Sequence, residues 1–197
     1  GLPVGPYAVI TDKDWRRDKA AAMDAVHGLS WPVFVKPARA GSSMGITKVS
    51  DPEALEAAIE AAREHDPKVV VEAAVFGREI ECGVLEGHGT DPTRTSELGE
   101  CIVVQNPEFY DFEAKYLSEG DVRLEAPADV PQEVADRIRE MAARAFDVAG
   151  CEGLARVDFF LTETGDVLVN EVNTMPGFTP HSMYPRMWAA SGMSYPE

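Results

Sequence analysis

The chain has 197 residues, of which 45% are hydrophobic and 26% charged, as is typical of a globular protein with a sizeable core. Its net charge of −16, from 34 acidic and 18 basic residues, disfavours binding to nucleic acid or to an anionic membrane. No apolar run approaches roughly 18 residues and no signal-peptide pattern opens the chain, so we expect neither a membrane span nor secretion. A polyanionic small ligand would need a local group of cations. Lysines outside motifs are expected to be solvated: Lys13, Lys19 and Lys68.

The three cysteines, Cys82, Cys101 and Cys151, are odd in number and lack metal-ligand spacing. This usage indicates a reducing cytoplasm and side chains that fill the core. The chain begins without an initiator Met and ends just after an expected helix. We therefore expect a piece of a longer protein.

The first elements in chain order are a helix and a hairpin. Residues 14–28 have helical periodicity that ends at a glycine, and residues 32–37 are predicted to form a short buried strand. A loop rich in glycine and serine, residues 38–45, leads into a second strand at 46–49. The pattern predicts a β-hairpin with a glycine-rich tip.

A second helix is predicted after the hairpin. Ser50 or Asp51 is its expected N-cap, with Pro52 in its first turn. Residues 69–71 follow as a buried strand. The apolar residues of this helix recur at helical spacing: Leu55, Ala58, Ile59 and Ala62.

Beyond Gly77 the pattern changes to strands, at residues 79–85 and 99–104. A long irregular stretch at 105–129 follows, and loops of that length in compact domains usually have a function. Residues 131–150 are predicted to form a helix that ends at a glycine. The apolar stripe of this helix comprises Val134, Ile138, Met141, Ala145 and Val148.

The last two predicted strands, residues 154–161 and 167–173, form a hairpin through a turn at 162–166. Side chains alternate between the faces of a strand, so Arg156 and Asp158 share one face. On the second strand Glu171 and Asn173 likewise share a face, and Phe160 belongs to the first set.

The expected register of this hairpin pairs Asp158 with Glu171 and Arg156 with Asn173. Directly opposed carboxylates repel each other unless a cation bridges them. Two acids and an amide supply the hard oxygen ligands that magnesium prefers. The hairpin alone is equally compatible with solvent-facing polar positions on an amphipathic strand pair.

The loop Gly41-Ser42-Ser43-Met44-Gly45 offers backbone N–H groups and hydroxyls suited to phosphate. It is not a Walker motif, because no Gly-Lys-Ser/Thr closes it, and a glycine-serine hairpin tip by itself is more often a simple turn. Lys36 at the end of the preceding strand adds a cation in an acidic protein.

Three segments together resemble one family, the D-alanine:D-alanine ligases of the ATP-grasp superfamily. They are Val35-Lys36-Pro37 with Gly41-Ser42-Ser43-Met44-Gly45, residues 109–116 (FYDFEAKY) and residues 170–179 (NEVNTMPGFT). The resemblance covers essentially the whole chain in the family's order. It implies an α+β ATP-grasp fold with two antiparallel-sheet subdomains, 1–76 and 77–197, that enclose ATP between them.

The resemblance also implies the nucleotide contacts. Lys36 and Lys115 would bind the phosphates, and Glu72 would accept from the adenine amino group. Some of the contacts given next have simpler explanations: Glu79 could be an ordinary exposed strand residue, and Phe109 and Phe160 could be core residues. The remaining implied contacts are Ser42, Ser43 and Gly45 in the loop, the backbone of Ala73 and Val75, Glu79 on the ribose, and Phe109 and Phe160 beside the adenine.

For catalysis, the resemblance implies two Mg²⁺ ions, or Mn²⁺, on Asp158, Glu171 and Asn173. Arg156 and the N–H of Gly177 would stabilise a tetrahedral oxyanion. The other implied residues are Ser182, on the carboxylate of the second D-alanine, and the pair Ser42 and Tyr116, beside the first substrate.

The implied enzyme is an ATP-dependent carboxylate-amine ligase that makes D-alanyl-D-alanine for peptidoglycan, and we expect a cytoplasmic homodimer in the full-length protein. Tyr116 favours an amino acceptor. Alternatives are a ligase for D-lactate or D-serine, and a nucleotide-binding fragment that is inactive without the family's N-terminal domain. Ala73 departs from the lysine that relatives often carry, and Phe112 from a common tyrosine.

Overall fold

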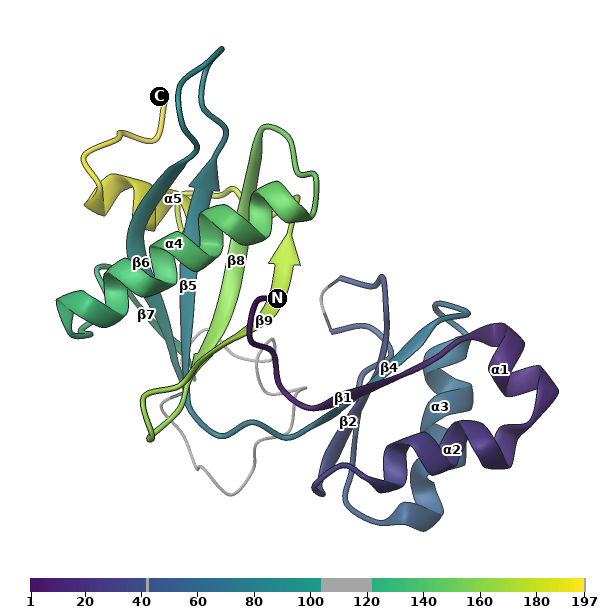
Figure 1. Ribbon diagram of the computed structural model, residues 1–197. Helices are drawn as coiled ribbons and strands as arrows, with labels where there is room; N and C mark the ends of the chain where they lie inside the picture. Colours follow the sequence, from purple (N-terminus) through teal and green to yellow (C-terminus); the bar gives the residue numbers. More distant parts are fainter. Residues whose placement is uncertain (42, 104–121, 197) are drawn as a thin grey trace. The chain divides into compact units, whose positions relative to one another are not determined.

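The computed structural model describes residues 1–41, 43–103 and 122–196, and these fall into two units. The N-terminal unit holds Gly5–Val75. The C-terminal unit holds Gly1–Val4 together with the described residues from Phe76 onward. Each contains one antiparallel sheet with helices (Figure 1), so the predicted α+β class with two antiparallel sheets is confirmed.

The sheet of the N-terminal unit has the strand order β1-β4-β2-β3. Its core forms where alternate strand residues, such as Val33, Val35 and Val71, pack against helical residues such as Trp15 and Ile59. The strands are β1 (Tyr7–Ile10), β2 (Val33–Pro37), β3 (Thr47–Val49) and β4 (Val69–Ala73), and the helices are α1 (Asp12–Arg17), α2 (Lys19–His27) and α3 (Leu55–Arg63).

The hairpin β2–β3 and helix α3 are where the sequence predicts them. Asp51 is the cap: its side chain accepts from the N–H of Glu53 and opens a 3₁₀ turn, η1 (Pro52–Ala54), before α3. All four apolar residues expected to face the core from α3 are buried: Leu55, Ala58, Ile59 and Ala62.

The single helix predicted at 14–28 is wrong. Asp18 is extended (φ −161, ψ 95) and separates α1 from α2, because its side chain caps α2 by accepting from the N–H of Ala21. Lys19 is also not simply solvated, since its Nζ lies 2.7 Å from Glu60 and 2.9 Å from Glu56 and sits 4.9 Å from the ring centre of Trp15.

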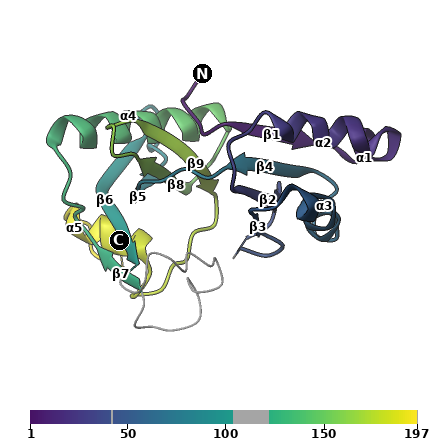
Figure 2. The ribbon, with the colours of Figure 1, turned by 90° about the horizontal axis from the view of Figure 1, so that it is seen from below.

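The sheet of the C-terminal unit has the order β7-β6-β5-β8-β9. Helix α4 packs on one face and α5 on the other (Figure 2). The strands are β5 (Arg78–Leu85), β6 (Arg94–Val103), β7 (Val122–Glu125), β8 (Leu154–Leu161) and β9 (Val167–Asn173), and the helices are α4 (Gln132–Val148) and α5 (Met183–Ala190).

Several boundaries in this unit differ from the predictions. Strand β6 begins at Arg94 rather than at Gly99, and β7 lies inside the stretch predicted to be irregular. On α4, Val148 is 77% exposed, because Phe146 rather than Val148 completes the face that packs on the sheet. Trp188 is buried, as predicted.

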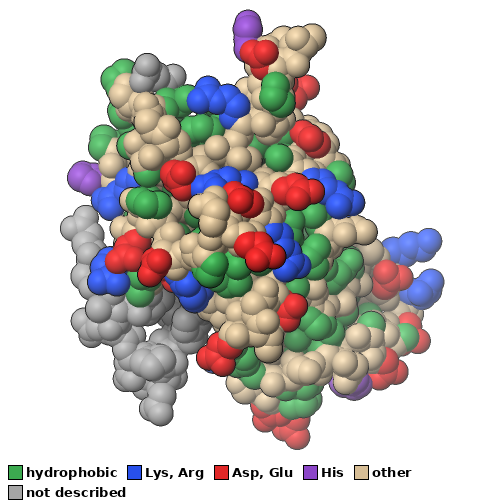
Figure 3. All heavy atoms as spheres, turned by 60° about the vertical axis from the view of Figure 1, so that its left-hand side comes forward, with side chains coloured by type: hydrophobic (Ala, Val, Ile, Leu, Met, Phe, Trp, Pro, Cys, Tyr) green, Lys and Arg blue, Asp and Glu red, His purple; other side chains and the backbone are tan. Residues whose placement is uncertain are grey.

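The cysteines differ in burial, and charged side chains of both signs lie on the surface. Cys82 is buried, whereas Cys101 and Cys151 are half-buried and none of the three forms a disulfide. Acidic and basic side chains are interspersed over the face in Figure 3, so the net negative charge is not one continuous acidic surface there. None of the described helices is long and apolar enough to cross a bilayer.

Candidate functional site

A row of carboxylates crosses three neighbouring strands of the C-terminal unit. Glu81 on β5 pairs with Asp158 on β8, and Asp158 pairs with Glu171 on β9. Paired residues in an antiparallel sheet share a face. Val157 and Phe159, which flank Asp158, belong to the core under α4, so the three carboxylates lie on the opposite face.

The register predicted for the hairpin is confirmed at these positions: Asp158 pairs with Glu171 and Arg156 with Asn173. Beyond them the pairing shifts by one residue, and Phe159 faces Val169. The irregularity accommodates the extra residue of β9, and such bulges re-aim side chains at sites. If the pairing next to the turn had continued along the strands without this shift, the side chain of Glu171 would have faced the core.

Hydrogen bonds tie the side chains of this row together. Arg156 holds Asp158 with two bonds, from Nε to Oδ1 and from Nη2 to Oδ2, both 2.7 Å long. The amide Nδ2 of Asn173 donates to Asp158 Oδ2 at 3.2 Å and to Glu171 Oε1 at 2.9 Å. The carboxylates of Asp158 and Glu171 therefore converge on one point.

Burial has the largest effect on the pKa of Asp158 and raises it well above its ordinary value. The bonds from Arg156 oppose this rise in pKa, and the negative charges of Glu81 and Glu171 add to it. Burial also disfavours the charged form of Arg156, but its bonds to Asp158 and the surrounding carboxylates raise its pKa overall. A bound cation would favour ionised Asp158.

The donor set fits a hard divalent cation. Two carboxylates and the amide oxygen of Asn173 match the few protein ligands that magnesium takes, the rest being water and phosphate. Within the described residues, no three His, Cys, Asp or Glu side chains group as a metal cluster. Glu81 lies beside Arg156, whose Nε is 3.2 Å from Glu81 Oε2.

Glu81 is a residue that the sequence reasoning missed. Its signal was present, because Glu79 and Glu81 are two residues apart in a predicted strand and must share a face. The prediction treated Glu79 alone. Glu79 itself pairs with Phe160 across β5 and β8, and both are half-buried on the face of the carboxylate row.

Two residues predicted to bind nucleotide meet in the N-terminal unit. Lys36 Nζ and Glu72 Oε2 form an ion pair of 2.6 Å on the sheet face opposite the helices. The two side chains are 20% and 27% exposed. The N–H of Ala73 is used in bonding Pro6 O at 3.0 Å, so this group is committed within the fold. Val75 follows β4 directly.

The glycine-serine loop has two residues in left-handed backbone conformations, Ser43 (φ 59) and Gly45 (φ 74). The N–H of Met44 bonds Gly41 O within the loop. A Cβ at Gly45 would collide with the ring of His65, so both φ and space require glycine there.

The base of this loop is anchored by Asp66. Its carboxylate accepts from Arg39 Nε at 2.8 Å and Nη2 at 3.0 Å and from the N–H of Lys68 at 2.9 Å. The Arg39 guanidinium, with help from the Lys68 N–H, lowers the pKa of Asp66 to about 2.

Replacing Asp66 by Asn is expected to destabilise the N-terminal unit by about 1 kcal/mol at pH 7, since Arg39 is exposed and its attraction is screened by water. Because the folded pKa is lowered, the contribution is complete above about pH 4 and is lost as the pH falls toward about 2. Urea unfolding of both proteins at pH 7 and pH 3 measures this. A difference that grows on acidification would contradict it.

The segment proposed for the second substrate is ordered by Ser182, the residue before α5. Its Oγ accepts from the N–H of Thr179 at 3.1 Å and lies 2.9 Å from Thr179 Oγ1. A Cβ at Gly177 would lie 3.0 Å from the same Oγ. Gly177 and Ser182 are therefore close to each other.

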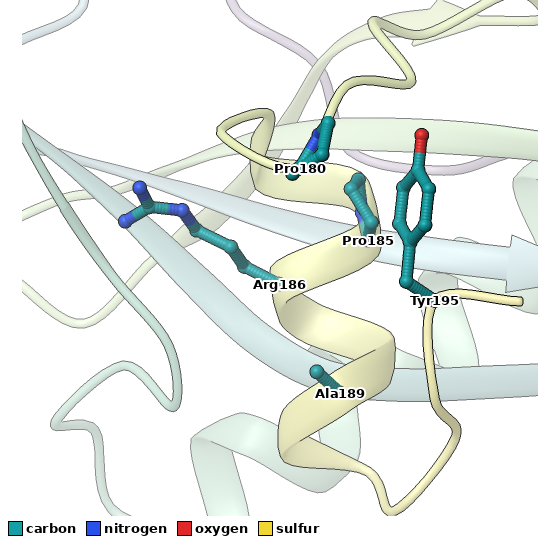
Figure 4. Close-up of a pocket in the computed structure, with 5 residues that line it drawn as sticks. All are labelled: Pro180, Pro185, Arg186, Ala189 and Tyr195. Carbon is teal, nitrogen blue, oxygen red and sulfur yellow. The ribbon is translucent and has the colours of Figure 1, made fainter.

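Four residues with predicted roles lie outside the described residues: Ser42, Phe109, Lys115 and Tyr116. A hollow of about 220 Å³ lies at α5 (Figure 4), and none of the predicted site residues lines it. Its lining consists of Pro180, Pro185, Arg186, Ala189 and Tyr195.

Comparison with solved structures places the chain in the ATP-grasp fold of D-alanine ligases. It is 38% identical to the VanG D-Ala:D-Ser ligase from Enterococcus faecalis, with a TM-score of 0.82, covering 99% of this chain and 54% of that chain. It is 37% identical to D-alanyl-alanine synthetase A from Vibrio cholerae, with a TM-score of 0.79, covering 98% of this chain and 57% of that chain.

The family model described as D-ala D-ala ligase C-terminus matches residues 1–197, and the chain belongs to this family. Curated relatives named D-alanine--D-alanine ligase include that of an Arthrobacter species, 60% identical over 198 residues, covering 100% of this chain and 52% of the relative. That of Streptomyces griseus is 54% identical over 203 residues, covering 100% and 50%. The chain thus spans about half the length of the curated relatives it matches.

Proposed function

We propose that this chain is the C-terminal part of a D-alanine:D-alanine ligase, an ATP-dependent enzyme that joins two D-alanine molecules for peptidoglycan precursors. The observation that carries the proposal is the bonded group of Arg156, Asp158, Glu171 and Asn173 in a chain of this family. The whole protein is proposed to be a cytoplasmic homodimer, with ATP-grasp subdomains at 1–76 and 77–197 of this chain.

Asp158, Glu171 and Asn173 are proposed to hold two Mg²⁺ ions, which Mn²⁺ can replace. Bound magnesium would neutralise phosphate charge during phosphoryl transfer. The support is the convergence of two carboxylates that repel each other, with an amide beside them. Asn173 donates through its nitrogen here and would offer Oδ1 to a cation.

The proposed nucleotide contacts come from residues whose pairing supports them. Lys36 is proposed to bind ATP phosphate and Glu72 the adenine amino group, and their ion pair shows that both reach the same sheet face. Glu79 and Phe160, paired on the face of the carboxylate row, are proposed to contact ribose and adenine. The other proposed contacts are Ser42, Ser43, Gly45, the backbone of Ala73 and Val75, Phe109 and Lys115.

The proposed chemistry has two steps. The carboxylate of the first D-alanine attacks the γ-phosphate of ATP, giving an acyl phosphate and ADP. The amine of the second then attacks the acyl carbon, and phosphate leaves after a tetrahedral oxyanion has formed. Arg156 and the N–H of Gly177 stabilise that oxyanion, because fixed donors at developing charge are effective where water is scarce.

Substrate placement is assigned to three further residues. Ser182, held near Gly177, would bind the carboxylate of the second D-alanine together with the N-terminus of α5. Ser42 and Tyr116 would border the first substrate. Tyr116 supports an amino rather than a hydroxyl acceptor.

A second candidate is ligation of D-alanine to D-serine, favoured by the structural likeness to the VanG D-Ala:D-Ser ligase. Steady-state kinetics of the full-length protein would separate the two, with D-alanine, D-serine and D-lactate as second substrates. We expect kcat/KM for D-alanine to exceed the others at least about tenfold, since an acceptor site discriminates by differences of a few kcal/mol. A preference for D-serine or D-lactate at neutral pH would replace our assignment with the alternative.

The kinetic test uses the whole protein because the chain spans about half its relatives, and a fragment lacking first-substrate contacts could bind nucleotide without ligation. ATP hydrolysis dependent on D-alanine, with D-alanyl-D-alanine as product, is the expected result. ATP turnover without any dependence on D-amino acids would overturn the proposal.

A further inference from the structure

Glu81 is a half-buried carboxylate to which neither the family's motifs nor the proposed mechanism gives a role. Its side chain is 12% exposed, next to Arg156 at 20% and Asp158 at 13%. On the other side of Glu81, its partner on β6 is Gly99. Met183 of α5 packs closely over Gly99: a Cβ at this glycine would lie 2.5 Å from Met183 Sδ. Among the described contacts of Glu81, the one on the β8 side joins its Oε2 to Arg156 Nε at 3.2 Å.

Two carboxylates share one guanidinium at this point. Arg156 Nε lies 2.7 Å from Asp158 Oδ1 and 3.2 Å from Glu81 Oε2, while Nη2 donates to Asp158 Oδ2. Asp158 thus has both oxygens engaged by Arg156. To bind a cation it must share or release part of this contact, and Arg156 would then need another anchor to keep its orientation.

We propose that Glu81 is a positioning residue that anchors Arg156 and thereby lets Asp158 turn toward a divalent cation. The inference rests on the proposed function of Arg156 and Asp158. Glu81 takes over the Nε contact when Asp158 engages the cation. The guanidinium keeps its place on the sheet, so its remaining N–H groups face the developing oxyanion. Residues that orient ligands in this way typically change metal affinity or activity by about 10- to 100-fold when lost.

Two variants separate anchoring from charge alone. Glu81→Gln keeps the length and removes the charge, and Glu81→Asp keeps the charge but withdraws it by one methylene. If Glu81 anchors Arg156, both variants lower kcat about tenfold or more, with a smaller change in KM for D-alanine. A residue that merely supplied negative charge would tolerate Glu81→Asp.

Glu97→Gln is the matched control. Glu97 on β6 of the same sheet also pairs with an arginine, Arg139, at 2.5 Å, but it is absent from the carboxylate row. This variant should retain kcat within about twofold. Melting temperatures of all variants are measured alongside, so that a loss of fold is visible.

The decisive readout is Mn²⁺ binding by the full-length protein with ADP, followed by electron paramagnetic resonance without turnover. We expect the apparent dissociation constant to rise about tenfold or more in both Glu81 variants and to stay unchanged in Glu97→Gln. Unchanged Mn²⁺ affinity and kcat in Glu81→Asp would overturn the proposal, as would loss of fold in both Glu81 variants. If the parent protein failed to ligate D-alanine, the proposed function would fail, while the Mn²⁺ titrations would still decide the role of Glu81.

Discussion

Glu171→Gln is expected to lower metal-dependent ATP turnover about 1000-fold, because loss of one anionic ligand weakens a charge interaction worth several kcal/mol in the transition state. Glu171 is exposed and its Oε1 accepts a hydrogen bond from Asn173 Nδ2, so the substitution leaves the core untouched. The melting temperature of the metal-free protein should therefore stay within a few degrees of the parent. Turnover assays over a range of Mg²⁺ concentrations measure the effect.

The control for this experiment is Glu163→Gln, in the turn of the same hairpin. Glu163 is exposed and lies at the far end from the carboxylate row. It should retain full activity. Activity of Glu171→Gln within a few-fold of the parent would remove Glu171 from the proposed metal site.

Arg156→Lys is expected to reduce kcat about 100-fold, since lysine keeps the charge but cannot make the two parallel bonds to Asp158 or present a fixed donor to the oxyanion. Arg156→Ala should lose more activity and also lower the melting temperature, because buried Asp158 and half-buried Glu81 then lack the positive charge of Arg156. Single-turnover kinetics and thermal unfolding separate the two effects.

Added guanidinium offers a further check on Arg156. If the side chain acts through its donors, millimolar guanidinium should restore part of the activity of Arg156→Ala and none of Arg156→Lys, where the space is filled. Arg123→Ala is a suitable control, because Arg123 on β7 pairs with Glu125 away from the row. Wild-type kcat in Arg156→Lys would contradict the assigned role.

The hairpin of β8 and β9 was predictable because its pattern is local. Alternation fixes which side chains share a face, and the short turn limits the register. The shift beside Phe159 was not predicted, because the irregular pairing depends on how Val169 and Val172 both reach the core. The paired positions of Asp158 and Glu171 nevertheless agree with the prediction.

Elements whose evidence is non-local were missed. Strand β1 (Tyr7–Ile10) follows a segment rich in proline and glycine and becomes a strand by pairing with β4, more than fifty residues later. Strand β7 likewise depends on β6. The break at Asp18 shows the opposite limit, since a capping side chain interrupted a pattern that periodicity alone made continuous.

The predicted set of site residues was incomplete for a related reason. Glu81 lies on a strand that is distant in sequence from the hairpin, and only sheet order brings it beside Asp158. The Lys36–Glu72 pair similarly requires the neighbouring placement of β2 and β4. Sequence motifs identified the residue types, whereas the partners of Arg156 and Lys36 follow from tertiary pairing.

The central claim is that Asp158, Glu171 and Asn173 hold a divalent cation beside nucleotide phosphate. A crystal structure of the full-length protein with ADP and Mn²⁺, with manganese located by anomalous scattering, tests it most directly. We expect a manganese ion about 2.0 to 2.6 Å from oxygen atoms of Asp158, Glu171 and Asn173, with Arg156 against Glu81. Manganese bound elsewhere, with Asp158 still held by both nitrogens of Arg156, would contradict it.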